Sequence, residues 1–135
     1  MGTARQTASS GSPFESRIGF SRAHRVGDYI AVSATAAIGD DGSTVGVGDL
    51  YVQTVRCLDI AEQALADVGA SIDHVVRTRV MLTDMTRWAE AAQAHGERFA
   101  DVRPASTFVE VTGFIDPDWL VEIEVDAIVA DADGS

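Results

Sequence analysis

Residues 49–83 read DLYVQTVRCLDIAEQALADVGASIDHVVRTRVMLT, and this stretch decides the fold class because a helical pattern and a strand pattern follow each other in it. Its first part predicts a helix from Asp49 to Val68, since apolar side chains recur there at steps of three and four residues. Asp49 is suited to cap the N-terminus of this helix, and Gly69 to take the left-handed conformation that often ends one. The recurring apolar residues are Tyr51, Val55, Leu58, Ala61, Leu65 and Val68.

The second part of the stretch, Val75–Thr83, predicts a strand. It is rich in β-branched residues, and its side chains alternate between a mainly apolar and a mainly polar set. The two expected faces carry Val76, Thr78, Val80 and Leu82 on one side, and Arg77, Arg79 and Met81 on the other.

Outward from this stretch, the chain predicts four more strands, a second helix and a long loop. The strands are expected at 17–25, 29–34, 105–112 and 120–130, and the loop at 39–48. The first two strands flank a turn at 26–28 and form a hairpin, and the loop is exposed because it holds four glycines and two aspartates. Asp84 or Thr86 is suited to cap the second helix, which Arg103 and Pro104 end.

The resulting order, β-β-α-β-α-β-β, predicts an α+β fold in which both helices cover one face of a mixed sheet. The other face of the sheet is then left open. A domain of this size can bury such a face by associating with copies of itself, so the pattern favours an oligomer.

The two ends of the chain lack apolar periodicity. Residues 1–13 are small and polar, and residues 131–135 are equally polar, so we predict a flexible arm and a flexible tail. Residues 14–130 then form one domain, which suits a chain of 135 residues.

The composition restricts compartment and partners. The chain has 21 Asp and Glu against 10 Lys and Arg, for a formal net charge of −11. Nucleic-acid binders need a basic surface to neutralise phosphates, so we expect no nucleic-acid partner. We also expect no membrane partner and a cytoplasmic location, since no apolar run approaches the roughly 18–20 residues of a membrane span and the N-terminus lacks a secretory signal pattern. The single cysteine, Cys57, excludes an internal disulfide.

The last predicted strand carries three carboxylates on one face, at Glu122, Glu124 and Asp126. They repel one another unless solvated or paired, and Arg77 and Arg79 on a neighbouring strand are available as partners. A carboxylate partly enclosed at a subunit interface would instead have a raised pKa and could move a proton or activate water. The sequence leaves both interpretations open.

Other candidate groups carry weaker signals. His95 lies on the apolar side of the second helix with no metal-binding partner at the next turn, so we expect a packed residue and no metal. Ser33 is not in a nucleophile-elbow sequence. The loop at 39–48 lacks the Lys-Ser/Thr ending of a phosphate cradle.

Several segments together resemble the RidA (YjgF) family. They are the hairpin with Ser33, and the residues at 67–70, 73–78, 82–85, 103–111 (RPASTFVEV) and 121–124 (VEIE). The resemblance spans about residues 15–130, and the last two motifs at their mutual spacing are the most specific. It implies a chorismate-mutase-like fold and a homotrimer with small-molecule pockets at the subunit interfaces. The best-known members hydrolyse reactive enamines and imines to 2-oxo acids and ammonia, without metal or organic cofactor.

The resemblance also implies which residues line such a pocket. Glu122 matches a glutamate that helps to position or activate the attacking water, and Ser33 matches a pocket serine. Ser106 stands where the family has an arginine that holds the substrate carboxylate as a bidentate fork. Ser21 replaces a pocket tyrosine, and Phe108 replaces a small residue.

These departures indicate a pocket whose lining has changed. Arg22 and Arg79 are the candidates for any relocated contact to an anion, and both also have an interpretation as surface or structural ion-pair partners. We therefore expect an imine or enamine deaminase whose substrate differs from 2-aminoacrylate-type imino acids. The alternative is a non-catalytic trimer that binds or senses a small molecule. A ribonuclease is disfavoured by the charge of −11.

Overall fold

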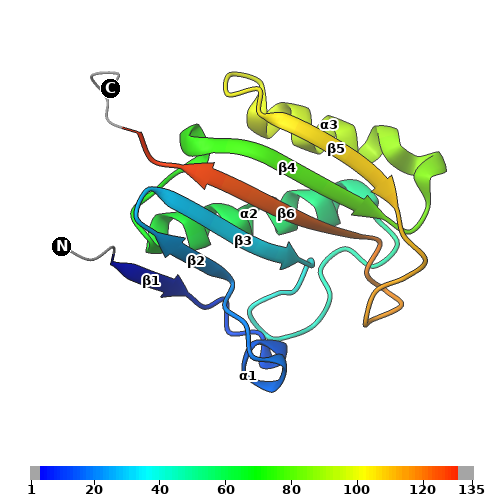
Figure 1. Ribbon diagram of the computed structural model, residues 1–135. Coiled ribbons are helices and arrows are strands. Elements are labelled where there is room, and N and C mark those ends of the chain that lie inside the picture. The colour runs from blue at the N-terminus through cyan, green and yellow to red at the C-terminus, as the bar shows by residue number, and fades with distance from the viewer. Residues whose placement is uncertain (1–3, 131–135) are drawn as a thin grey trace.

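The structure, a computed structural model, describes residues 4–130. Its centre is a six-stranded mixed sheet with the strand order β1-β2-β3-β6-β4-β5 (Figure 1). Only β4 and β5 run parallel, and all other neighbouring strands are antiparallel. The strands are β1 (Arg5–Ala8), β2 (Ala23–Val26), β3 (Tyr29–Thr35), β4 (Val75–Leu82), β5 (Ala105–Glu110) and β6 (Val121–Ile128). The helices are α1 (Pro13–Ile18), α2 (Leu50–Asp67) and α3 (Trp88–Phe99), with the short 3-10 turns η1 (Ile72–His74) and η2 (Met85–Arg87).

The two long helices cover one face of the sheet, which confirms the predicted α+β architecture (Figure 1). The carboxylate of Asp49 accepts a hydrogen bond from the backbone N–H of Val52 at 3.0 Å and so caps α2 as expected. Gly69 follows the helix with a φ of +84°, a conformation that costs glycine little. The core between α2 and the sheet includes fully buried Leu65 and Ile123.

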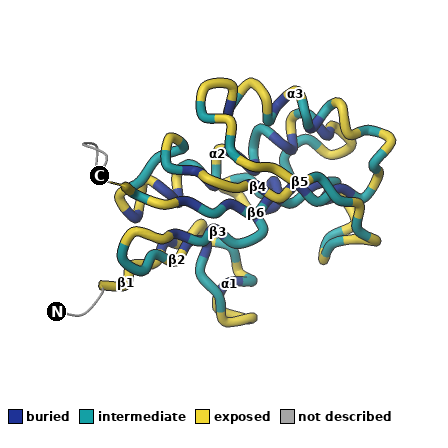
Figure 2. The backbone as a smooth tube through the Cα atoms, turned by 45° about the horizontal axis from the view of Figure 1, so that its top comes forward, coloured by how far each residue is buried: buried dark blue, intermediate teal, exposed yellow. Residues whose placement is uncertain are grey.

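On the opposite face of the sheet, no helix formed by residues 4–130 lies over the strands (Figure 1). Along β6, buried residues alternate with half-buried ones, as the sequence pattern predicts (Figure 2). Arg79 pairs with Glu124 at 2.7 Å and Arg77 with Asp126 at 4.0 Å, so these carboxylates have the arginine partners that the sequence made available. No helix within residues 4–130 is both long and apolar enough to cross a membrane.

The prediction for Val76 was wrong. We expected it on the same face as Thr78, but Val75 is the buried residue and Val76 is 44% exposed. The pairing of β4 with β6 shifts register between Val75 and Arg77, as at a β-bulge. Such a bulge adds a residue on one strand, so the alternation changes sides there.

The N-terminal segment also differs from the prediction. Residues 1–13 were predicted as a flexible arm, but Arg5–Ala8 forms β1, which pairs antiparallel with β2. Residues 17–25 were predicted as one strand, but the first part of this segment ends α1, and only Ala23–Val26 is extended. The predicted tail at 131–135 lies outside the described residues.

The chemistry of the segment explains the difference. Backbone pairing in β1 needs no apolar side chains, so a small polar sequence can form an edge strand. Ser12 accepts a hydrogen bond from the backbone N–H of Phe14, and Pro13 occupies the first turn of α1, where its missing N–H costs nothing.

Candidate functional site

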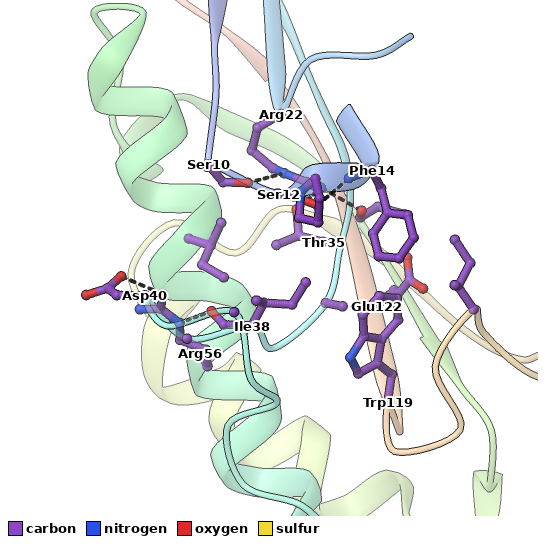
Figure 3. Close-up of a pocket in the computed structure, with 18 of the residues that line it drawn as sticks. Ser10, Ser12, Phe14, Arg22, Thr35, Ile38, Asp40, Arg56, Trp119 and Glu122 are labelled. Atoms are coloured by element: carbon purple, nitrogen blue, oxygen red, sulfur yellow. Dashed lines mark hydrogen bonds and ion pairs between the residues drawn. The ribbon is translucent and has the colours of Figure 1, made fainter. Parts of the chain in front are cut away.

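A cavity of about 410 Å³ opens where α1, the loop after β3, α2 and the start of β6 meet (Figure 3). Its lining is mainly apolar, with a few charged side chains among the apolar ones, which is the usual make-up of a small-molecule site. The apolar lining includes Phe14, Ile18, Ile38, Ile60, Ile115 and Trp119. The charged lining consists of Arg22, Asp40, Asp41, Arg56 and Glu122.

Glu122 reaches this cavity from the second position of β6. Its neighbours Val121 and Ile123 are fully buried in the core, and strand alternation turns Glu122 away from them. Its carboxylate accepts no hydrogen bond from any side chain or backbone group within residues 4–130. Burial raises the pKa of Glu122, the nearby Arg22 opposes that rise, and Glu124 adds to it. The net result is a carboxyl group whose pKa lies above its ordinary value.

Arg22 comes from the segment just before β2 and is only 5% exposed. Its Nε donates a hydrogen bond to Ser10 Oγ at 3.1 Å, and its Nη1 donates to the Ala34 carbonyl at 2.8 Å and to Thr35 Oγ1 at 3.2 Å. The pairing of β3 with β6 shifts register between Val32 and Thr35, next to this carbonyl. Arg22 therefore ties the N-terminal segment to an irregular end of β3.

Arg22 also has an ionic partner, Glu15 of α1, with Nε 3.8 Å from Oε2. Burial raises the pKa of Glu15, but hydrogen bonds from Ser10 to the carboxylate outweigh burial and leave that pKa lowered. Glu15 is thus held ionised beside Arg22. The Nη2 of Arg22 has no partner in the described chain, whereas every fully buried side-chain N or O atom of the described residues has one. Nη2 is therefore not fully buried. Because Arg22 lines the cavity, a ligand in the cavity can reach this atom.

A second arginine, Arg56, lines the side of the cavity opposite Glu122 (Figure 3). Arg56 of α2 donates from Nε to the Ile38 carbonyl at 2.8 Å, and its Nη2 lies 3.4 Å from the carboxylate of Asp40. In Figure 3 this pair and the side chain of Glu122 lie on opposite sides of the cavity.

Two aromatic rings lie on the same side of the cavity as Glu122 (Figure 3). Phe14 and Trp119 meet edge to face, with ring centroids 6.0 Å apart. Trp119 is 6% exposed and donates from Nε1 to Thr44 Oγ1 at 3.1 Å, so the glycine-rich loop fixes its ring.

Of the residues predicted for the site, the structure brings Glu122 and Arg22 together in this cavity. Ser33 donates a hydrogen bond from its hydroxyl to the backbone carbonyl of Ser21 at 2.7 Å. Ser21 and Ser33 line a separate hollow, open and shallow, beside α1.

The remaining predicted residues lie elsewhere in the chain. Ser106 on β5 is hydrogen-bonded to Thr78 at 2.7 Å, and Thr78 to His95 Nε2 at 2.8 Å. The Phe108 ring meets the His95 ring at 5.9 Å, so this group faces α3. Arg79 is exposed and paired with Glu124. Within one chain, none of Ser106, Phe108 and Arg79 reaches the cavity of Glu122.

Sequence reasoning missed Phe14, Glu15 and Trp119 as parts of this region. The run Ser12-Pro13-Phe14-Glu15 fits the S-x-x-E pattern of a helix start, and it would have placed Phe14 and Glu15 on a helix. Nothing in the sequence indicated that Trp119 lies against this helix. Within residues 4–130, no group of three or more His, Cys, Asp or Glu side chains is arranged to hold a metal ion.

Comparison with known proteins gives consistent matches. The family model described as endoribonuclease L-PSP matches residues 11–129. An uncharacterized protein of Streptomyces coelicolor is 42% identical over 118 residues, which cover 87% of each chain. The 3-aminoacrylate deaminase RutC of Acinetobacter baylyi is 30% identical over 101 residues, 75% of this chain and 79% of that one. The crystal structure of a YjgF/YER057c/UK114 family member from Mycobacterium tuberculosis is 44% identical, with a TM-score of 0.84 over 93% of this chain and 100% of the other.

Proposed function

The chain belongs to the RidA (YjgF) family, whose model carries the description endoribonuclease L-PSP, and from this premise we propose that it is an imine or enamine deaminase. In this reaction water adds to the carbon of a C=N bond, and the resulting carbinolamine collapses to a carbonyl product and ammonia. The observation that carries the proposal is the unpartnered carboxylate of Glu122, half-buried in an apolar cavity. Its substrate differs from 2-aminoacrylate-type imino acids, since Ser106 replaces the family's carboxylate-binding arginine.

Glu122 takes the role of general base and then of general acid. The ionised carboxylate accepts a proton from the attacking water and returns it to the leaving nitrogen. A carboxyl group with a raised pKa suits both steps, because proton transfer in either direction is easiest when the pKa lies near the working pH. Arg22 donates from its accessible Nη2 to the oxygen that is added to the substrate carbon.

We further propose that the working unit is a homotrimer in the cytoplasm, with pockets shared between copies. The open face of the sheet supports association, because one face of the central strands has no helix over it. The distribution of the predicted residues supports shared pockets. Glu122 is not reached by the other predicted pocket residues of its own chain, which are Ser21, Ser33, Arg79, Ser106 and Phe108. Any contact between Glu122 and these residues therefore has to come from a second copy of the chain.

The test compares two carboxylates of the same strand. Imines are generated in the assay by an amino-acid or amine oxidase, and the release of ammonia is measured above the spontaneous rate. Glu122→Gln is expected to lower the accelerated rate at least about 100-fold, the usual contribution of a general base. Glu124→Gln is the control from the same strand, since Glu124 is paired with Arg79 and lies outside the cavity. Because Glu124 adds to the raised pKa of Glu122, this variant is expected to change the rate slightly, and far less than Glu122→Gln does.

Two outcomes count against the proposal. Equal activity of Glu122→Gln and the unmodified protein removes Glu122 from the reaction. If none of the imines tested is hydrolysed while ligands raise the melting temperature of the protein, the alternative of a non-catalytic binding or regulatory trimer is favoured. That alternative rests on the serine at position 106.

A further inference from the structure

We infer that the cavity around Glu122 selects imines that carry a bulky apolar or aromatic group and no carboxylate, so that the bound substrate is neutral or cationic. The inference rests on the proposed function for the reaction. The substrate class itself follows from the charge, lining and size of the part of the site that one chain supplies.

The first step is the balance of charge around Arg22. This arginine faces two carboxylates, that of Glu15 at 3.8 Å and that of Glu122, which lines the same cavity. Its positive charge is therefore already matched before any ligand enters. A ligand carboxylate placed beside Nη2 would stand near two like charges, and such contacts are strongly unfavourable at a partly desolvated site.

The second step concerns the rest of the charged lining. Arg56 is paired with Asp40, but the side chain of Asp40 is fully exposed, so solvent screens it as it does Asp41. The two arginines of the cavity then stand against two less exposed carboxylates, those of Glu15 and Glu122. Asp41 is exposed and holds Ser43 of the loop by two hydrogen bonds, so its field is largely screened by solvent. Glu122 is the half-buried member, and its field acts within the cavity. The lining thus offers a ligand carboxylate no unmatched positive charge, while the half-buried carboxylate of Glu122 is available to a positive group.

The third step is the aromatic lining next to Glu122. The rings of Phe14 and Trp119 and the carboxylate lie on one side of the cavity. Arg17 already lies over the Phe14 ring, 5.6 Å from its centroid, so the two rings mainly offer apolar area to a flat substituent. An iminium ion, R–CH=NH₂⁺, with an apolar R group suits both the carboxylate and the rings.

The fourth step is size. The cavity of about 410 Å³ lies within the range of about 300–1,000 Å³ that encloses drug-sized ligands. A three-carbon imine would leave most of this volume to water. Ile38, Ile60 and Ile115 line the cavity, and a bulky apolar group would bury their surface.

The reaction is balanced for this class of substrate. Water adds to the iminium carbon while Glu122 accepts one of its protons. The C–N bond then breaks as the nitrogen takes that proton, and the hydroxyl proton of the intermediate passes to the released ammonia. The sum is R–CH=NH₂⁺ + H₂O → R–CHO + NH₄⁺. The carboxylate stabilises the iminium ion before attack, so it is the charge of the substrate nitrogen, and not a substrate carboxylate, that Glu122 recognises.

The kinetic test uses four imines that differ in two properties. Amine oxidase and oxygen convert phenethylamine and ethylamine to imines without a carboxylate, and amino-acid oxidase converts phenylalanine and alanine to the matching imino acids. We expect the largest acceleration for the imine of phenethylamine, at least about tenfold above that for the imine of phenylalanine. The ethylamine imine is expected to be the poorer substrate of the two that lack a carboxylate.

The binding test does not depend on turnover. Calorimetry compares phenethylammonium with 3-phenylpropanoate, which share the phenyl group and differ in charge. We expect phenethylammonium to bind more tightly, and Glu122→Gln to weaken its binding about tenfold without weakening that of 3-phenylpropanoate. Glu124→Gln, on the same strand, is expected to change both affinities far less than Glu122→Gln changes that of phenethylammonium.

The outcomes separate this inference from the proposed function. Preferred hydrolysis of the phenylalanine imine leaves the deaminase proposal intact and overturns the selection of substrates without a carboxylate. Tighter binding of 3-phenylpropanoate, or no binding of either probe, also overturns the selection. If no imine is hydrolysed while phenethylammonium binds in preference and depends on Glu122, the charge selection of the cavity stands and the deaminase proposal fails.

Discussion

Glu122 combines two properties that rarely coincide in a surface carboxylate: it has no hydrogen-bond partner within the described residues, and burial raises its pKa. Both follow from its position at the start of β6, where the strand passes between the cavity and the core. A partnered carboxylate such as Glu124, in contrast, is held by Arg79 on an exposed face. The same strand thus carries one carboxylate in an ion pair and one available for chemistry.

The first prediction concerns the pH dependence of hydrolysis. In the proposed reaction Glu122 is the base in its ionised form, and its pKa is raised. Activity is therefore expected to fall as the pH decreases through a value above the ordinary range of a glutamate. The measurement is kcat/KM for one imine between pH 4 and 8, corrected for the spontaneous reaction and for protonation of the imine. An acidic limb that persists unchanged in Glu122→Gln would assign the titration to another group.

The second prediction concerns Arg22. Replacing it with methionine leaves the ionised Glu15 buried without its cation and removes the tie between Ser10 and the end of β3. Breaking a buried ion pair on one side costs about 3 kcal/mol of unfolding free energy. The check is urea unfolding followed by circular dichroism.

Arg79→Met is the matched control for Arg22→Met. Arg79 also has a carboxylate partner, but within one chain both side chains are exposed, so the loss of this ion pair is expected to cost less than about 1 kcal/mol. Equal losses in the two variants would show that Arg22 is no more than a surface partner.

Among the elements, α2 is the one that its own sequence predicts most directly. Its buried face follows the three-and-four spacing, and its first turn has a side-chain cap. The segment containing β1 and α1 is the opposite case, because its strand depends on pairing with β2 and its helix is only six residues long. Short elements of this kind are held by tertiary contacts, such as the bond from the Arg22 backbone N–H to the Ala8 carbonyl at 2.9 Å.

The third prediction tests the cap of α2. Asp49→Ala removes the acceptor for the backbone N–H of Val52 and is expected to lower the unfolding free energy by about 1 kcal/mol. The measurement is the midpoint of thermal or urea unfolding. Asp73→Ala serves as the control, because the side chain of Asp73 accepts no hydrogen bond from residues 4–130 and its loss should be near zero. Similar shifts in both variants would mean that lost negative charge, not the cap, sets the effect.

On the scale of the whole molecule, α2 and α3 cover one face of the sheet, and no helix of the described part of the chain covers the other (Figure 1). The uncovered face carries arginine–carboxylate pairs between β4 and β6, including Arg77 with Asp126. The groups that the family resemblance assigns to one pocket are distributed over separate parts of a single chain.

The fourth prediction is the mass of the particle in solution. Sedimentation equilibrium at micromolar concentration is expected to give three times the mass of the chain, because the proposed working unit is the homotrimer that the family resemblance implies. A monomer under these conditions would remove the shared pocket, and the cavity around Glu122 would then have to act within one chain.

The sequence by itself determined the α+β class, the capped helix at Asp49, the strands β4, β5 and β6, and the placing of Glu122 on a strand face away from the core. These features depend on periodicity and local capping, which a chain carries in the spacing of its residues. Tertiary structure alone decided that Val76 is exposed, that Arg5–Ala8 joins the sheet, and that Phe14, Trp119 and Arg22 meet at Glu122. The exposure of Val76 depends on a register shift, the place of Arg5–Ala8 on backbone pairing, and the cavity on contacts between residues far apart in the chain. None of these three causes produces a periodic pattern in the sequence.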